Sequence, residues 1–214
     1  MRGFLATDAG YVAGLDATER EVLATVVADV AELLGAGRFT AAPRVGAPDV
    51  ADPTQTLLGL HAVPAVVPAP IDPAVHRLLP DASDDDPELA AEFRRLTEGD
   101  LRQTKVDRLR ALWLALAARP ADDDFLVARG DAPALAATLT DLRLVLADRL
   151  GVESDEDSEA LYDALDRRDH GEANPGRSAR EVLQDEIRDY LGSLYAALSW
   201  LQESLLHVLT EDLP

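Results

Sequence analysis

The chain has 214 residues, of which 47% are hydrophobic and 5% aromatic, and its formal net charge is −20. A chain of this length and hydrophobic content can bury a core of mostly aliphatic side chains, which argues against global disorder. The negative charge disfavours direct, sequence-independent binding to DNA, and the absence of cysteine excludes disulfides, thiol switches, iron–sulfur clusters and thiolate zinc sites.

The first predicted element is a β-hairpin over residues 1–15. Two short apolar runs, residues 4–6 and 11–15, flank the turn-forming residues 7–10. An isolated hairpin is barely stable in water, so this one must pack on the rest of the chain. Residues 125–128 are a candidate third strand beside it.

A helix is predicted to follow the hairpin. Asp16 and Glu19 form a capping-box pattern at its start, and Gly35 is placed to end it. A second, short helix is predicted over residues 52–60. Prolines then keep residues 64–70 extended, so this part of the chain is expected to act as a connector.

Residues 72–118 form a central helical block around which we expect the other elements to be organised. A short helix at residues 73–79 and a second helix from residue 87 each begin with proline after an aspartate, a pattern typical of helix starts. We expect a bend at Gly99 and a third helix over residues 98–118. One face of the second helix carries Leu89, Phe93 and Leu96, and the stripe of the third carries Leu101, Leu109, Leu112 and Leu116.

The only lysine of the chain, Lys105, falls within the apolar stripe of the third helix. One interpretation is that its stem packs on apolar neighbours while the ammonium group reaches water. The other is that the cation is buried and paired with a carboxylate, for which Glu92 and Asp141 are the candidates. Neither interpretation implies catalysis.

Two further helices are predicted after the candidate third strand. In the helix at residues 131–150, Arg143 is expected at the edge of the buried stripe and Asp141 away from it. An acidic loop at residues 153–157 is predicted to separate this helix from a shorter one at residues 158–168.

A flexible loop at residues 169–177 and a long helix at residues 178–210 complete the chain. The helix has apolar residues at alternating steps of four and three, a heptad seam made of Ile187, Leu191, Leu194, Leu198, Leu201, Leu205 and Val208. Trp200, Glu203 and His207 project from its other side. Trp200 is expected to be covered by another helix of the chain or offered to a partner.

The sequence contains no established catalytic motif. It has no phosphate-binding lysine loop, no dinucleotide-binding glycine pattern and no nucleophile elbow. Glu203 and His207 are four residues apart and could share a metal, but three or four ligands are needed and no others are apparent. We therefore expect no enzyme activity, no cofactor and no metal site.

Several short sequence motifs, taken together, resemble those of one known family. The motifs are Asp72-Pro73-Ala74, Arg77-Leu78-Leu79-Pro80-Asp81, Glu92-Phe93-Arg94-Arg95-Leu96-Thr97, Asp100-Leu101-Arg102 with Lys105, Asp141-Leu142-Arg143-Leu144, and Trp200-Leu201-Gln202-Glu203. They are similar to those of actinobacterial oxidative-stress-responsive transcriptional regulators of the AosR type, formerly filed as a domain of unknown function. The resemblance implies a role in transcription through a protein partner such as an extracytoplasmic-function sigma factor. A cysteine switch would be missing here.

The sequence therefore predicts a single, mainly α domain over residues 1–214: a bundle of about six to eight helices with a small N-terminal β-hairpin. We expect an acidic cytoplasmic regulator that contacts a sigma factor or RNA polymerase, reaches DNA only indirectly, and has no membrane segment. The residues expected to form its partner-binding surface or its internal ion-pair network are Glu92, Arg94, Arg95, Lys105, Asp141, Arg143 and Trp200. The alternatives are an orphan enzyme or metal-binding bundle, an adaptor in regulated proteolysis, and a homodimer paired along the seam.

Overall fold

The structure is a computed structural model that describes residues 1–39, 67–118, 124–169 and 179–212. It is mainly α, with a small antiparallel sheet at the N-terminal end, which confirms the predicted fold class. None of the described helices is both long enough and apolar enough to cross a bilayer. The predicted helix at residues 52–60 and residues 170–177 of the predicted loop at 169–177 lie outside the described residues, while residue 169 still belongs to a helix.

The sheet has the order β1 (Arg2–Thr7), β2 (Gly10–Gly14) and β3 (Asp124–Val127). Val12 of β2 lies opposite Leu5 on one side and Leu126 on the other, so the hairpin and the third strand are both confirmed. Gly10 has a φ of +140°, and a Cβ there would lie 2.3 Å from the carbonyl oxygen of Val127. Only glycine fits this close approach of the two strands.

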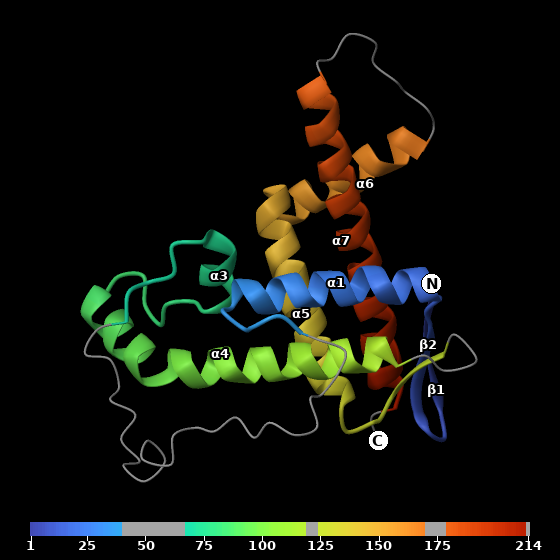
Figure 1. Cartoon of the computed structure of the whole chain (residues 1–214), viewed down its shortest axis with the longest axis horizontal. Coiled ribbons are helices and arrows are strands. Elements are labelled where there is room, and N and C mark those ends of the chain that lie inside the picture. The colour runs from blue at the N-terminus through green and yellow to red at the C-terminus, as the bar shows by residue number, and fades with distance from the viewer. Residues whose placement is uncertain (40–66, 119–123, 170–178, 213–214) are drawn as a thin grey trace.

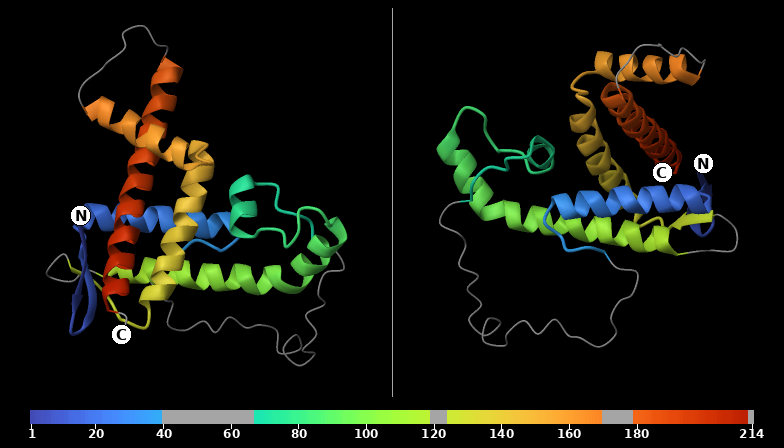
Figure 2. Two further views of the ribbon diagram at one scale, coloured as in Figure 1. Left: turned by 180° about the vertical axis from the view of Figure 1, so that it is seen from behind. Right: turned by 45° about the horizontal axis from the view of Figure 1, so that its top comes forward.

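Two pairs of helices form the body of the molecule. α1 (Ala17–Leu33) lies along α4 (Pro87–Ala117), and α5 (Ala132–Leu150) lies along α7 (Ala179–Glu211). Figures 1 and 2 show the α1–α4 pair running across the α5–α7 pair. The short α3 (Pro73–Leu78) packs on α5, and α6 (Asp155–Asp169) packs on α7. The core between these helices is mostly aliphatic, as the low aromatic content of the sequence predicts. Its fully buried side chains include Leu15, Leu34, Leu109, Leu142, Leu198 and Leu205.

Local hydrogen bonds at the helix ends account for several predicted boundaries. Asp16 and Glu19 make the reciprocal capping box at the start of α1. Asp72 accepts from the N–H of Ala74, and Asp86 caps α4 in the same way. Gly151 ends α5 in the left-handed conformation, with φ +72°.

The predicted division of this stretch into two helices, with a new one starting at residue 98, is wrong, because α4 is one continuous helix of 31 residues. Its N-terminal part curves in Figures 1 and 2, but the helix does not end there. A glycine inside a helix costs only about 1 kcal/mol, and the turns on both sides outweigh that cost. The Thr97 hydroxyl accordingly donates to the carbonyl oxygen of Phe93 within the helix instead of capping a new one.

α6 begins at Asp155, three residues before its predicted start, so the predicted loop at residues 153–157 is too long. Asp157 accepts from the N–H of Ser154, and the hydroxyl of Ser154 accepts from the N–H of Asp157. This is a capping box with aspartate in place of the usual glutamate. The carboxylate of Asp157 accepts from the backbone N–H of Glu153 and from the hydroxyl and backbone N–H of Ser154, and these hydrogen bonds lower its pKa because they stabilise its charged form.

Candidate functional site

Lys105 is buried and paired, which confirms the second interpretation of this residue. Its ammonium nitrogen lies 2.5 Å from a carboxylate oxygen of Asp141, and the two side chains are only 13% and 6% exposed. Asp141 lies off the leucine stripe of α5, as its spacing predicts, and is nevertheless buried. α5 is covered by α7 on one side and by α4 on another, so a residue off the main stripe is still inside the protein.

Arg143 joins α5 to α7 through neutral groups, with no carboxylate partner among the described residues. Its guanidinium donates to the hydroxyl of Ser199 at 2.8 Å and to the amide oxygen of Gln202 at 2.7 Å. The same group lies over the ring of Tyr195, 5.4 Å from the ring centre. Gln202 in turn donates to the hydroxyl of Thr140 on α5. Arg143 therefore belongs to the framework between two core helices.

The three remaining charged residues of the predicted set divide between interior and surface. Arg94 pairs with Asp81 and donates to the carbonyl oxygen of Val67, so it fixes the chain before α4. Glu92 and Arg95 pair with each other on the exposed side of α4, at 2.6 Å. The hydrogen bond from Arg95 lowers the pKa of Glu92. Only this last pair is available at the surface.

The apolar face predicted at the start of α4 is not buried. Leu89, Phe93 and Leu96 are each more than two-fifths exposed, although buried residues lie further along the same helix. Helical spacing places such residues on one side of a helix, but does not say whether another element covers that side.

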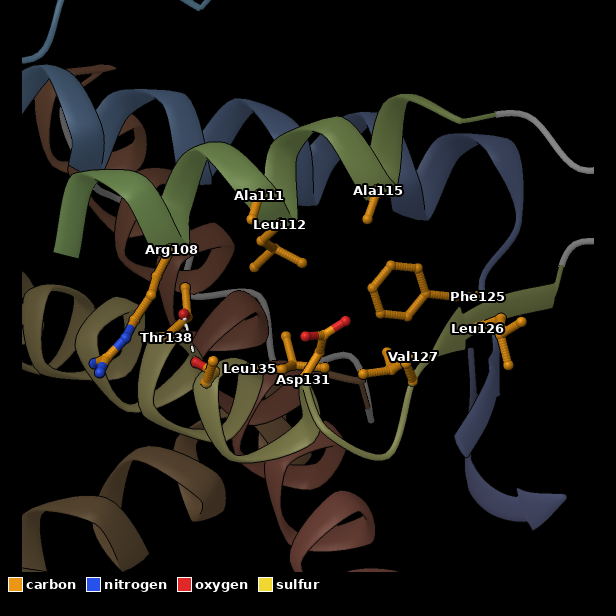
Figure 3. Close-up of a pocket in the computed structure, with 12 residues that line it drawn as sticks. Arg108, Ala111, Leu112, Ala115, Phe125, Leu126, Val127, Asp131, Leu135 and Thr138 are labelled. Carbon is orange, nitrogen blue, oxygen red and sulfur yellow. Dashed lines mark hydrogen bonds between the residues drawn. The ribbon is translucent and has the colours of Figure 1, made fainter. Parts of the chain in front are cut away.

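One pocket, shown in Figure 3, lies between α4, β3 and α5 and has a volume of about 190 Å³. Arg108 lies at one end and Phe125 at the other, with mainly apolar side chains between them. The hydroxyl of Thr138 is engaged with the carbonyl oxygen of Ala134. The pocket offers apolar volume, and none of Glu92, Asp141 and His76, the residues expected in an enzyme cleft, lines it.

A larger groove, of about 420 Å³, lies between α1 and α7. We call it the α1–α7 groove; its lining residues are Met1, Thr18, Glu19, Val22, Leu23, Leu194, Ala197 and Trp200. Trp200 forms part of one wall, and 45% of its surface is exposed. A Cβ on Gly3 of β1 would lie 3.4 Å from its ring, so β1 covers one edge only. Trp200 is thus neither fully covered by this chain nor fully free.

The apolar side of α7 continues beyond this groove toward the N-terminus of the helix. Leu183, Ile187 and Tyr190 are each about half exposed, and Leu194 follows four residues later. The predicted heptad seam is therefore buried from Leu194 onward, whereas its first residue, Ile187, is at the surface. We call Leu183, Ile187, Tyr190, Leu194 and Ala197 the α7 face. Leu194 within it is only 7% exposed, and Trp200 borders it from the α1–α7 groove.

No metal site is formed by the described residues, in which no group of three or more histidine, aspartate or glutamate side chains is placed to hold an ion. The predicted proximity of Glu203 and His207 brings no further ligand. The imidazole of His207 instead lies 3.5 Å from the carboxylate of Glu211, one turn further along α7.

Comparison with protein families gives one result. The family model described as "Domain of unknown function (DUF2017)" matches residues 1–209. Searches of curated proteins and of solved structures gave no match to this chain.

Proposed function

The chain belongs to the DUF2017 family, and we propose that it is an acidic transcription regulator that acts by binding another protein. The role in transcription rests on the resemblance of several short sequence motifs to those of stress-responsive regulators. The net charge of −20 supports an indirect route to DNA, because phosphate backbones are bound through lysine and arginine.

The observation that carries the proposal is the half-exposed α7 face beside the α1–α7 groove. Large apolar side chains gathered on one side of a helix are typical of surfaces that bind other proteins. Aromatic residues are frequent among the side chains that dominate such contacts; this face offers Tyr190, and the adjoining groove offers Trp200. The partner would be a sigma factor or RNA polymerase, and any redox signal would reside in that partner, since this chain has no cysteine.

The test is a binding experiment with purified components. The immobilised chain is exposed to core RNA polymerase, to individual sigma factors and, separately, to promoter DNA at about 0.15 M salt, where long-range charge effects are screened. We expect saturable binding of a sigma factor or of the polymerase, and no shift of promoter DNA by the chain alone.

Two results would overturn this proposal. Tight unaided binding to duplex DNA would mean that the chain contacts promoters itself. Binding to the unfolding subunit of a protease, with none to polymerase or sigma factors, would instead indicate an adaptor in regulated proteolysis.

A further inference from the structure

We infer that the α7 face receives an amphipathic helix of the partner, with apolar residues toward α7 and lysine or arginine along its edges. This inference rests on the proposed function, because it requires a protein partner. It adds the place of contact and the chemistry of the segment that binds there.

The α7 face has the shape that a helix needs. Leu183, Ile187, Tyr190, Leu194 and Ala197 follow one another at steps of four and three, which aligns them along one side of α7. At 1.5 Å per residue, the stretch from Leu183 to Ala197 is about 21 Å long, or roughly four helical turns. This is the common arrangement in which an amphipathic helix lies in an apolar groove.

Within the described parts of the chain, α6 packs on a different side of α7 and leaves this one open. A Cβ on Gly192 would lie 3.1 Å from a methyl group of Leu161, so α6 approaches α7 closely there. Tyr162 of α6 also stacks on Tyr195, with ring centres 6.3 Å apart. Positions 192 and 195 lie on another side of the helix from positions 183 and 190. The two helices therefore leave room for a third, as in a three-helix bundle.

The charges beside the α7 face select the partner. Glu186 is exposed between Leu183 and Tyr190, and Glu19 of α1 lines the groove. The one arginine of α1, Arg20, is buried and donates to the carbonyl oxygen of Leu15. Arg180 and Arg188 of α7 are exposed, so the attraction for a cationic partner comes from the net charge of −20 as well as from Glu186. A second copy of this chain would bring the same negative charges, whereas a helix with basic edges is attracted to them.

The probe for this inference is a labelled synthetic helix of about five turns, with leucines on one face and lysines on both edges. A second peptide has the same leucines and glutamates in place of the lysines. Fluorescence anisotropy with the full chain should show one-to-one saturable binding of the basic peptide. The acidic peptide should bind at least about tenfold more weakly.

Two matched variants locate the contact. Ile187→Glu adds a charge in the middle of the α7 face, at a half-exposed position where folding should tolerate it, and should weaken binding of the basic peptide at least about tenfold. Leu126→Glu makes the same chemical change at an equally exposed leucine on β3, and should leave binding within about twofold. Circular dichroism of both variants should match that of the parent chain.

Several outcomes would overturn the inference. Equal weakening by the two variants would mean that overall charge, and not the α7 face, attracts the peptide. If the parent chain forms dimers as its concentration is raised, and Ile187→Glu abolishes them, the α7 face binds a second copy of this chain instead. If Ile187→Glu still binds the polymerase or sigma factor as the parent does, the α7 face is not the contact, although the proposed function stands. If the chain binds the basic peptide but no polymerase or sigma factor, the α7 face would still be a site for a basic helix, but the proposed function would be rejected.

Discussion

Removal of Lys105 should destabilise the fold far more than removal of the whole ion pair. At 2.5 Å and an effective dielectric constant of about 20, the attraction between Lys105 and Asp141 is about 7 kcal/mol. Transfer of each ion out of water costs several kcal/mol, so the pair as a whole is nearly neutral for stability. Lys105→Met removes the attraction but leaves Asp141 buried, and should cost about 3–5 kcal/mol of unfolding free energy.

The measurement is urea denaturation of the parent, Lys105→Met, Asp141→Leu and the double variant, read by circular dichroism. Each single variant should lower the midpoint, whereas the double variant should recover most of the loss, within about 1 kcal/mol of the parent. A Lys105→Met variant within about 0.5 kcal/mol of the parent would contradict the argument. It would mean that Asp141 finds another partner or water when the lysine is absent.

Three more predictions concern local contacts. Arg102 pairs with Glu98 at 2.6 Å, and the other carboxylate oxygen of Glu98 is buried with no hydrogen-bond partner among the described residues. Arg102→Ala would leave this carboxylate unpaired and should lower the unfolding free energy, measured by urea denaturation, by about 2 kcal/mol. The loss is modest because the arginine is one-third exposed. The hydrogen bond from Arg149 lowers the pKa of Asp72, so its stabilisation is present above the unfolded-state pKa and is lost as pH falls through the folded-state pKa. Asp72→Asn keeps the helix cap but removes this charge. Its unfolding free energy should be lower than that of the parent by at most about 1 kcal/mol at pH 7, and the difference should vanish in acid. A difference that does not change with pH would contradict this cause. Gly192→Leu should push α6 off α7 at a cost of about 1–3 kcal/mol, seen as faster hydrogen exchange in α6 with unchanged exchange in the sheet.

Local sequence signals predicted most of the described elements. The capping box at Asp16, the glycine stop at Gly151 and the run that forms β3 depend on neighbours within a few residues, so the sequence contains the information needed. The continuity of α4 through Gly99 was missed because a glycine signals a break only when no neighbouring turns support the helix.

Contacts between distant elements were predicted less well. Asp141 is buried because α4 crosses α5 on the side away from α7, and helical spacing within α5 carries no record of that crossing. The predicted heptad seam began at Ile187, but this residue is exposed because no described helix packs on that turn of α7. The spacing within α7 does not show where its neighbours end. The sequence limited the partner of Lys105 to two candidates, Glu92 and Asp141, because a buried cation requires a carboxylate nearby.

The internal contacts of the basic residues bear on the choice of partner. Lys105, Arg94 and Arg143 are tied to groups inside the protein, and Arg20 of α1 is buried. The cations that could offset a net charge of −20 are thereby partly withdrawn from the surface, while the carboxylates beside the α7 face stay exposed. A partner with basic edges would therefore be attracted over a distance of about 8–10 Å, and its association rate should fall steeply as salt is raised. A rate that does not respond to salt would leave apolar contact with Tyr190 and Trp200 as the only source of recognition.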